Sequence, residues 1–400
     1  MNMKNFNIAL IGVGGRGEGL YRVSLKNRGY LNIRAVCDSY PDRCDYIADE
    51  VARHGRPRPK CYTDYKKCID EIKPDAVVVA TGWDDHIKVS MYAMEHNVAV
   101  ACEVGGAYSL ESLWELVRCY ERTGTPIMML ENCCYGRPEL LALNMKRLGL
   151  LGEIVACRGG YRHDLREEIT SGAEKRHYRL EQYKRRNCEN YPTHGIGPIA
   201  KILDINCGNR FTSLYSVGSK SVGLKEYVKE HAVESLKDVE FRQSDIVTTV
   251  IKCANGETVT ITLDTCLPRY YSRDFLVQGT KGLVCVENNS VYLEQDNEGE
   301  IWDWKEKFNN IESYYDRYGH SLWKDYRPGK EGHGGMDVLV FDAFFDALDA
   351  GAPMPIDVYD MATWMAVTLL SEQSIATGQA AAFPDFTEGK WIVRKNNFLR

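Results

Sequence analysis

The segment Asn7-Ile-Ala-Leu-Ile-Gly-Val-Gly-Gly-Arg-Gly17 decides the fold of the N-terminal part of the chain. Its apolar residues predict a buried strand, and Gly12, Gly14 and Gly17 follow with the GxGxxG spacing of a turn that opens a helix. The backbone N–H groups of such a turn, together with the helix dipole, can hold a pyrophosphate. The segment therefore predicts a βαβ unit that binds a dinucleotide.

An acidic residue follows the second predicted strand, residues 33–37. Asp38 has the spacing at which Rossmann folds place the carboxylate that accepts hydrogen bonds from the adenosine ribose, and this favours NAD over NADP. The other interpretation is a glycine-rich turn with an unrelated helix-capping aspartate further on. It requires strand, turn, helix and acid to coincide by chance, so we prefer the dinucleotide site.

The first 130 residues alternate short apolar runs with amphipathic stretches, which is the order of βαβ units in a parallel sheet. Further strands are predicted at residues 76–80 and 98–102, and helices at 42–54, 86–95 and 110–122. We therefore expect a Rossmann domain that binds NAD over residues 1–132.

The pattern changes after about Glu131, where longer strands alternate apolar and polar residues. Such strands are predicted at residues 154–161, 247–253 and 258–263, and late helices at 332–350 and 358–378. The dipeptide Asn255-Gly256 is typical of a hairpin between the last two strands. The chain is thus expected to be an α/β protein whose second domain, residues 133–400, is α+β with an open, mainly antiparallel sheet.

The composition argues against several classes of function. Of the 400 residues 44% are hydrophobic, and 50 Lys and Arg against 56 Asp and Glu give a net charge of -6 without long single-sign blocks. This charge pattern predicts no nucleic-acid or membrane-surface partner. No apolar run reaches the ~18 residues of a membrane span and no leader pattern opens the chain, so we expect a cytoplasmic protein. The 14 scattered cysteines predict reduced, mostly buried thiols, and the lack of CxxC or HxxxH spacing predicts no metal site.

Several motifs together resemble the Gfo/Idh/MocA oxidoreductases. They are the glycine-rich loop 12–17, Cys37-Asp38, Thr81-Gly-Trp-Asp-Asp-His86, Glu103 and Gln278-Gly-Thr-Lys-Gly282. The resemblance covers essentially the whole chain and implies a dinucleotide-binding domain followed by a domain whose open sheet lies against the nicotinamide. One motif departs from the family. Glu103-Val-Gly105 stands where its sugar and inositol dehydrogenases usually carry Glu-Lys-Pro, so the usual catalytic lysine is missing.

Longer segments resemble a narrower branch, the NAD-dependent glycoside hydrolases of family 109, known as α-N-acetylgalactosaminidases. The matching segments are residues 130–136, 160–166, 190–198, 269–273, 332–337, 357–360 and 383–391. Carried over by position, the resemblance implies the catalytic residues Glu131, Tyr161, Tyr191, His194 and one tyrosine of Arg269-Tyr-Tyr-Ser, of which we favour Tyr271. The dinucleotide site is expected to contain Gly12, Gly14, Gly15, Arg16, Gly17, Asp38, Thr81, Trp83, His86, Glu103 and Asn132.

The residues of the catalytic set have a chemistry of their own. His194 is the side chain best suited to take a hydroxyl proton near neutral pH, and Pro192 constrains the loop that carries it. Glu131 follows a predicted strand, where a carboxylate anchors sugar hydroxyls or, in the other interpretation, forms a structural salt bridge. Tyr161 lies near a strand end, where packing alone also explains a tyrosine.

Three other features have two interpretations each. His86 resembles a family histidine near the nicotinamide, but by itself it would cap the helix that follows. His333 in Gly332-His-Gly-Gly either faces the pocket, which we favour, or starts a helix. The basic residues in 175–179 and 184–186 are interpreted as a solvated lid or a subunit-contact arm in preference to a clamp for an anionic sugar.

The resemblance suggests a route without the usual pair of catalytic carboxylates. The sugar C3 hydroxyl is oxidised with NAD+, the C2 proton is removed, the group on C1 is eliminated, water adds at C1, and C3 is reduced again. His194 with Tyr191 would manage the C3 hydroxyl proton and Tyr161 the C2 proton, while Glu131 or Tyr271 would steer water and leaving group. A sugar or polyol dehydrogenase that releases NADH is the second hypothesis, and a non-catalytic dinucleotide-binding sensor is the third.

The expected partners are small molecules and a second copy of the chain. The resemblance implies an α-N-acetylgalactosaminide, a small glycoside, as substrate, while nothing in composition or spacing indicates the preferred anomer. An exposed face of the C-terminal sheet favours a homo-oligomer.

Overall fold

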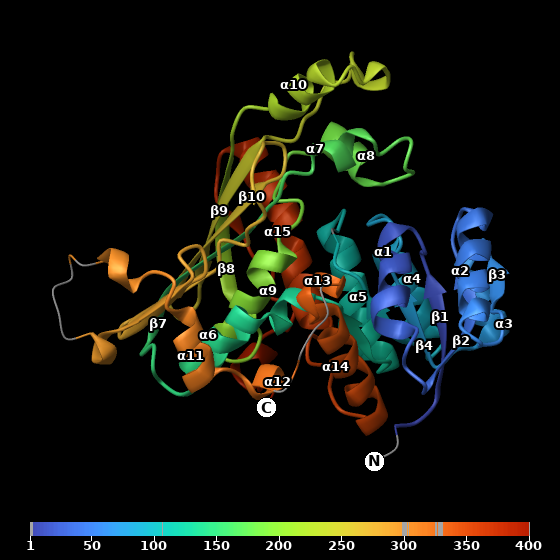
Figure 1. The fold of residues 1–400 in the computed structure, drawn as a ribbon, viewed down its shortest axis with the longest axis horizontal. Coiled ribbons are helices and arrows are strands. Elements are labelled where there is room, and N and C mark those ends of the chain that lie inside the picture. Colours follow the sequence, from blue (N-terminus) through green and yellow to red (C-terminus); the bar gives the residue numbers. More distant parts are fainter. Residues whose placement is uncertain are drawn as a thin grey trace. The chain divides into compact units, whose positions relative to one another are not determined.

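The computed structural model describes residues 3–105, 107–297, 302, 304–324, 326 and 331–399. The chain forms two compact units (Figure 1). Unit 1 contains Met1–Asn132, Pro328–Thr363 and Asn397–Arg400, and unit 2 contains Cys133–Arg327 and Trp364–Asn396. The domain limits 1–132 and 133–400 stay predictions.

Unit 1 is built on a six-stranded parallel sheet in the order β3-β2-β1-β4-β5-β6. The strands are β1 (Phe6–Ile11), β2 (Leu31–Cys37), β3 (Lys60–Tyr62), β4 (Ala76–Val79), β5 (Ala99–Cys102) and β6 (Ile127–Met129). Every residue of β4, β5 and β6 is buried, as expected for strands that are covered on both faces. The strand order turns back between β1 and β4, so the predicted Rossmann fold is confirmed.

Helices connect these strands. They are α1 (Gly15–Leu20), which continues as the π-helix η1 (Tyr21–Leu25), α2 (Pro41–Arg53), α3 (Tyr65–Ile72), α4 (His86–Glu95) and α5 (Leu110–Thr123). Local signals set their ends: the Asp64 carboxylate accepts a hydrogen bond from the Lys66 amide at the start of α3, and Gly124 ends α5 in the left-handed conformation.

A late part of the chain completes unit 1. It contains α13 (Glu331–Gly334) and α14 (Met336–Ala350), and α15 (Val358–Thr377) begins in it. The Phe345 ring on α14 packs 5.7 Å from that of Phe6, and the Met129 amide donates to the Ile356 carbonyl oxygen. The predicted helix 332–350 is wrong at its start, because all four residues from Gly332 to Gly335 have positive φ and form a left-handed turn.

Unit 2 is built on an eight-stranded sheet in the order β13-β12-β11-β7-β10-β9-β8-β14. Its strands are β7 (Ile154–Arg162), β8 (Phe211–Gly218), β9 (Ile246–Cys253), β10 (Thr258–Asp264), β11 (Leu276–Gly279), β12 (Gly282–Cys285), β13 (Ser290–Leu293) and β14 (Ala381–Ala382). Only β7 and β10 pair in parallel among these strands, which confirms a mainly antiparallel sheet. The hairpin predicted at Asn255-Gly256 joins β9 and β10, and Gly256 has a φ of 106°.

Unit 2 contains the larger part of α15, from Trp364 on. Its other described α-helices are α6 (Arg137–Arg147), α7 (Arg166–Thr170), α8 (Arg179–Arg185), α9 (Thr193–Ile202), α10 (Gly223–Glu230), α11 (Ile311–Tyr318) and α12 (Ser321–Lys324). Short 3-10 helices lie at η2 (Asn132–Tyr135), η3 (Glu234–Leu236), η4 (Glu294–Asp296), η5 (Trp304–Lys307) and η6 (Lys390–Ile392). Helix α9 is buried along its whole length and contacts β7. The contact is backbone to backbone, because a Cβ atom on Gly195 would lie 2.6 Å from the Gly160 nitrogen.

All 14 cysteines are free thiols, and all but Cys61 and Cys207 are buried. This agrees with the sequence prediction. In the part of the chain that the structure describes, no helix combines the length and apolar character that a bilayer crossing requires.

Candidate active site

The glycine-rich turn in unit 1 is shaped by close backbone contacts. Gly12 has a φ of 87°, and a Cβ atom there would lie 2.5 Å from the Ala80 carbonyl carbon. A Cβ atom on Gly17 would lie 2.1 Å from the Gly12 carbonyl oxygen, whereas one on Gly15 would meet nothing within 4 Å. The turn therefore needs glycine on its inner side and leaves bare backbone at Gly15, where α1 begins. A diphosphate group fits this arrangement.

Asp38 lies at the end of β2 and contacts the same turn. Its carboxylate accepts hydrogen bonds from the amides of Val13 at 2.8 Å and Tyr40 at 3.0 Å. The Arg43 guanidinium lies 3.9 Å from Asp38 Oδ1 and 4.7 Å above the Tyr40 ring. The buried carboxylate is thus fixed next to the glycine-rich turn, as a ribose-binding acid requires.

Three more predicted dinucleotide residues, Thr81, Trp83 and His86, follow β4. The buried His86 imidazole has its Nε2 atom 3.0 Å from the Thr81 carbonyl oxygen, and burial lowers its pKa to about 4. The ring is therefore neutral near pH 7, and this contact assigns the proton to Nε2, so that Nδ1 is an acceptor.

Two of these residues, Trp83 and His86, explain why the proline of the Glu-Lys-Pro motif is absent from position 105. A Cβ atom on Gly105 would lie 2.3 Å from Trp83 Cδ1 and 2.7 Å from His86 Nδ1. Because Trp83 and His86 occupy this space, neither proline nor any residue larger than glycine fits at position 105 without displacing them.

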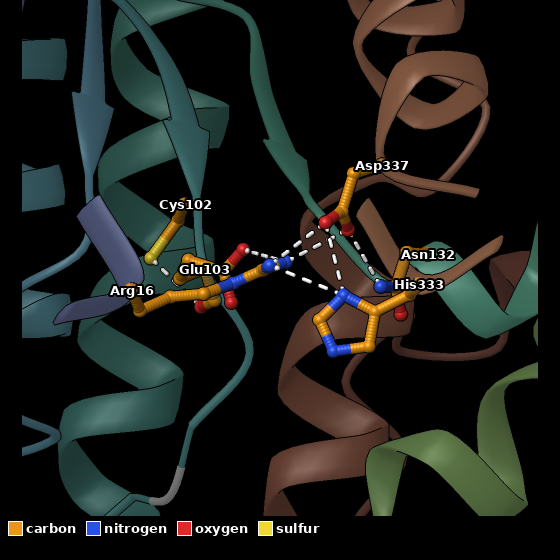
Figure 2. Close-up of polar contacts among 6 residues, drawn as sticks. All are labelled: Arg16, Cys102, Glu103, Asn132, His333 and Asp337. Atoms are coloured by element: carbon orange, nitrogen blue, oxygen red, sulfur yellow. Dashed lines mark hydrogen bonds and ion pairs between the residues drawn. The ribbon is translucent and has the colours of Figure 1, made fainter. Parts of the chain in front are cut away.

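The predicted residues Arg16, Glu103 and Asn132 meet in a second polar cluster, which Figure 2 shows. The Arg16 guanidinium donates two hydrogen bonds of 2.9 Å to the Asp337 carboxylate and lies 2.8 Å from Glu103 Oε1. Asn132 Nδ2 donates to Asp337 Oδ1 at 2.7 Å, and His333 Nδ1 lies 2.9 Å from Asp337 Oδ2. We call these five residues the Arg16 cluster. Asp337, to which three of the others bind, is the member that sequence reasoning missed.

The charges of the Arg16 cluster are fixed by these contacts. Burial alone would raise the pKa of Asp337, but hydrogen bonds from His333 and Arg16 and the charge of Arg16 hold it well below its usual range. Burial opposes the charge of Arg16 as well, and Glu103 and Asp337 together raise its pKa. Both groups are therefore ionised throughout the physiological pH range.

Unit 2 brings together four of the five predicted catalytic residues. We call Tyr161, His163, Tyr191, His194 and Tyr271 the aromatic cluster. The Tyr161 ring centroid lies 4.4 Å from that of Tyr191, 5.4 Å from that of His194 and 6.4 Å from that of Tyr271. Tyr191 and His194 are 4.9 Å apart. The fifth predicted residue, Glu131, is fully buried after β6 in unit 1, and its role beside the others stays a prediction.

A buried amide holds the loop that leads into α9. Gln243 Oε1 accepts hydrogen bonds from the Cys188 amide at 3.3 Å and from Asn190 Nδ2 at 3.1 Å, and Gln243 Nε2 donates to the Cys188 carbonyl oxygen at 3.0 Å. The Glu189 amide donates to Ser371 Oγ at 2.8 Å. These contacts fix the backbone immediately before Tyr191 and His194.

Arg179 is a buried cation of this site, so the solvated lid is wrong for this residue, while the subunit-contact arm stays a prediction. The solvated lid predicted for residues 175–179 does not describe Arg179, which is only 7% exposed. Its guanidinium lies 4.8 Å above the Tyr191 ring and 6.0 Å above the Tyr161 ring, and Nε lies 2.7 Å from Glu168. A buried cation over two phenol rings makes cation–π contacts with both and has N–H groups that can donate to the oxygens of a sugar.

Two family models match the chain. Residues 6–130 match the oxidoreductase family with the NAD-binding Rossmann fold, and residues 135–393 match the C-terminal domain of glycosyl hydrolase 109. The solved myo-inositol 2-dehydrogenase from Lactobacillus plantarum superposes with a TM-score of 0.68 over 95% of this chain and 100% of its own, at 16% identity. That similarity concerns the fold.

Curated relatives extend the match over both units. A glycosyl hydrolase family 109 protein from Stenotrophomonas maltophilia is 41% identical over 99% of this chain and 92% of its own length. An alpha-N-acetylgalactosaminidase from Tannerella forsythia is 39% identical over 92% of this chain and 83% of its own. This chain therefore belongs to glycosyl hydrolase family 109, and it is a glycosidase whose N-terminal part has the NAD-binding Rossmann fold of the Gfo/Idh/MocA oxidoreductases.

Proposed function

We propose that this chain hydrolyses small α-N-acetylgalactosaminides with NAD+ as a cofactor that is recycled in each turnover. Curated relatives with the name alpha-N-acetylgalactosaminidase support the substrate. The observation that carries the mechanism is the aromatic cluster, whose ionisable groups are phenols and imidazoles, with the guanidinium of Arg179 over the rings of Tyr161 and Tyr191. Such groups suit proton transfer from hydroxyl and carbon better than the double carboxylate chemistry of most glycosidases.

The residues of unit 1 fit NAD. The bare backbone of the turn would hold the diphosphate and Asp38 the adenosine ribose, while Thr81, Trp83, His86, Glu103 and Asn132 would lie along the rest of the dinucleotide. When bound, NAD+ accepts a hydride from a sugar carbon and later returns it. The acid at position 38 favours NAD over NADP.

His194 and Tyr191 would act at the C3 hydroxyl of the sugar. His194 accepts the hydroxyl proton as C3 becomes a ketone, and it returns the proton when the hydroxyl forms again. The Tyr191 ring, 4.9 Å from the imidazole, orients this group.

Tyr161 would act at C2. A ketone at C3 makes the C2 hydrogen acidic, so that the phenolate of Tyr161, stabilised by Arg179, can remove it as a proton. The electron pair of the C2–H bond forms a C1–C2 double bond, and the C1–O bond to the leaving group breaks. Water then adds at C1 while C2 regains a proton, with Glu131 or Tyr271 steering water and leaving group.

The assembly and location are also proposals. Tyr215, Val217 and Val250 expose apolar side chains on neighbouring strands β8 and β9, and this supports a homo-oligomer formed through the sheet. The 14 free thiols support a reducing, cytoplasmic location. The domain limits 1–132 and 133–400 are retained as a proposal.

Hydrolysis of nitrophenyl glycosides tests the proposed function. The full chain is assayed on α and β anomers of several sugars, with and without added NAD+, in H2O and in D2O. We expect release of nitrophenol from the α-N-acetylgalactosaminide without accumulation of NADH, and one deuterium at C2 of the sugar released in D2O. A sugar that keeps its C2 hydrogen would exclude the elimination, and steady NADH formation from free sugars would instead support a dehydrogenase.

A further inference from the structure

The glycine-rich turn has few means of fixing its own backbone. Four of the six residues from Gly12 to Gly17 are glycine, so Val13 and Arg16 supply all of its side chains. Val13 is buried. Arg16 is the second residue of α1, directly after the open backbone at Gly15, and its guanidinium lies in the Arg16 cluster. The Asp38 carboxylate holds the turn at the Val13 amide, and what holds Arg16 fixes its other end, where α1 begins.

Two carboxylates hold Arg16, and they come from distant parts of the chain. Glu103 follows β5, and Asp337 lies in the first turn of α14. Asp337 makes the stronger contact, since both of its oxygens accept from the guanidinium at 2.9 Å in the bidentate geometry. The Asp337 side chain is 3% exposed and that of Arg16 is 32% exposed, so the carboxylate end of this pair is buried.

Asp337 is itself held in place on two sides. Asn132, which follows β6, donates to Oδ1, and His333 contacts Oδ2 (Figure 2). His333 reaches this position from the left-handed turn 332–335, with φ 52° and ψ 46°, a conformation that costs free energy for a residue with a side chain. A Cβ atom on Gly332 would lie 2.4 Å from Val23 Cγ1, so the turn also packs closely against η1.

We propose that Asp337 is a positioning residue of the dinucleotide site, which holds Arg16 against Glu103 and thereby fixes the turn that binds the diphosphate. The proposal rests on the proposed function, in which the cofactor must stay bound between removal and return of the hydride. Without the Asp337 carboxylate, Arg16 keeps only Glu103 as an anion partner in the cluster. The backbone of the turn at Arg16 is then held less firmly. The cofactor then leaves faster.

Helix α14 contains a matched control for this proposal. Asp342 pairs with Arg28 and so joins the same helix to the segment after η1. If Asp337 served only to attach α14, then Asp337→Asn and Asp342→Asn would have similar effects. If Asp337 acts through Arg16, only Asp337→Asn changes the binding of NAD.

The experiment measures NAD+ binding to the full chain and to both variants by titration calorimetry. Their thermal midpoints without NAD+ report on folding. We expect Asp337→Asn to raise the Kd for NAD+ about tenfold or more, with a matching rise in the KM for NAD+ and an unchanged kcat at saturation. Asp342→Asn should leave the Kd within about twofold of the parent value, since it has no contact with the turn.

A second variant keeps the test decisive if Asp337→Asn does not fold. Arg16→Lys keeps the charge but cannot form the bidentate pair with both oxygens of Asp337, so it should also raise the Kd. An unchanged Kd in the folded Asp337→Asn or in Arg16→Lys, or an equal rise in Asp342→Asn, would overturn the proposal. If the parent chain bound no NAD+, the proposed function would fail instead, which is a different result.

Discussion

The rings of Tyr161 and Tyr191 lie 4.4 Å apart, centroid to centroid, at an interplanar angle of 33°. One ring comes from strand β7 and the other from the loop before α9, and the Arg179 guanidinium lies near both. In the proposed mechanism these two phenols, under one cation, act on neighbouring atoms of a single bound sugar.

Tyr161→Phe should separate proton removal at C2 from binding. The variant keeps the ring that packs against Tyr191 and loses only the hydroxyl, so the protein should fold normally. We expect the turnover number to fall by about 10²–10⁴-fold, the range for loss of a general base. Deuterium exchange at C2 should fall equally. Tyr215→Phe, on the exposed sheet face, is the control and should retain full activity.

Gly195→Ala should damage the site through the backbone. The new Cβ atom would lie 2.6 Å from the Gly160 nitrogen, so α9 must move away from β7 and shift His194. We expect a loss of about 1–3 kcal/mol in the free energy of unfolding, as for overpacking in a core, together with loss of activity. Gly19→Ala on α1 meets nothing within 4 Å and should be neutral or slightly stabilising. Urea unfolding of both variants measures these free energies. Equal stability of Gly195→Ala and Gly19→Ala would contradict the prediction.

Asp38→Asn should weaken the preference for NAD over NADP. The amide still accepts a backbone hydrogen bond, but the negative charge that repels a 2′-phosphate is gone. Arg43, now 3.9 Å from the Asp38 carboxylate, remains to attract it. We expect the ratio of the Kd values for NADP+ and NAD+ to fall at least about tenfold. In the double variant Asp38→Asn, Arg43→Ala this ratio should return towards the parent value. If the ratio stayed low, Arg43 would have no part in the binding of NADP+.

Glu189, two residues before Tyr191, should make folding pH-dependent. Burial raises its pKa to about 8 in spite of the Tyr191 and Leu263 amides, whereas an exposed glutamate titrates near 4.5. Between these values the folded state holds a proton that the unfolded state releases. Stability from this group is therefore complete below pH 4.5 and decreases by up to about 1.4 kcal/mol per unit as pH rises towards 8. Glu189→Gln should flatten this slope in urea midpoints measured from pH 5 to 8. If stability fell equally with pH in the parent and in Glu189→Gln, Glu189 would not be the source of the pH dependence.

Much of unit 1 is predictable because buried parallel strands are continuous apolar runs. The sequence places strands at 33–37 and 98–102, and the structure has Leu31–Cys37 and Ala99–Cys102. It predicts the helix His86–Glu95 at its observed ends. It does not predict β3, whose three residues Lys60-Cys-Tyr62 include two exposed ones, because an exposed edge strand needs no apolar pattern.

The missed site residues depend on contacts between distant segments. Asp337 is 321 positions from Arg16, and nothing near either residue indicates that they pair. Arg179 lies in a stretch of basic residues, and such a stretch predicts side chains exposed to solvent. Its packing against Tyr191, which makes it part of the site, is visible only in the structure. His333 was favoured as a pocket residue, and the structure shows its Nδ1 atom 2.9 Å from Asp337 and 3.4 Å from Arg16.

Unit 1 is completed by a segment from late in the chain, Pro328–Thr363, and this affects its folding during translation. Strands β1 to β6 leave the ribosome first, but Asp337 emerges 205 positions after its partner Asn132, and Ile356 emerges later still. The nucleotide-binding half is thus an incomplete nascent structure during most of translation. Truncated messages that end soon after codon 132 should yield an aggregation-prone polypeptide, and chaperone occupancy should be highest while the tail is still in the exit tunnel.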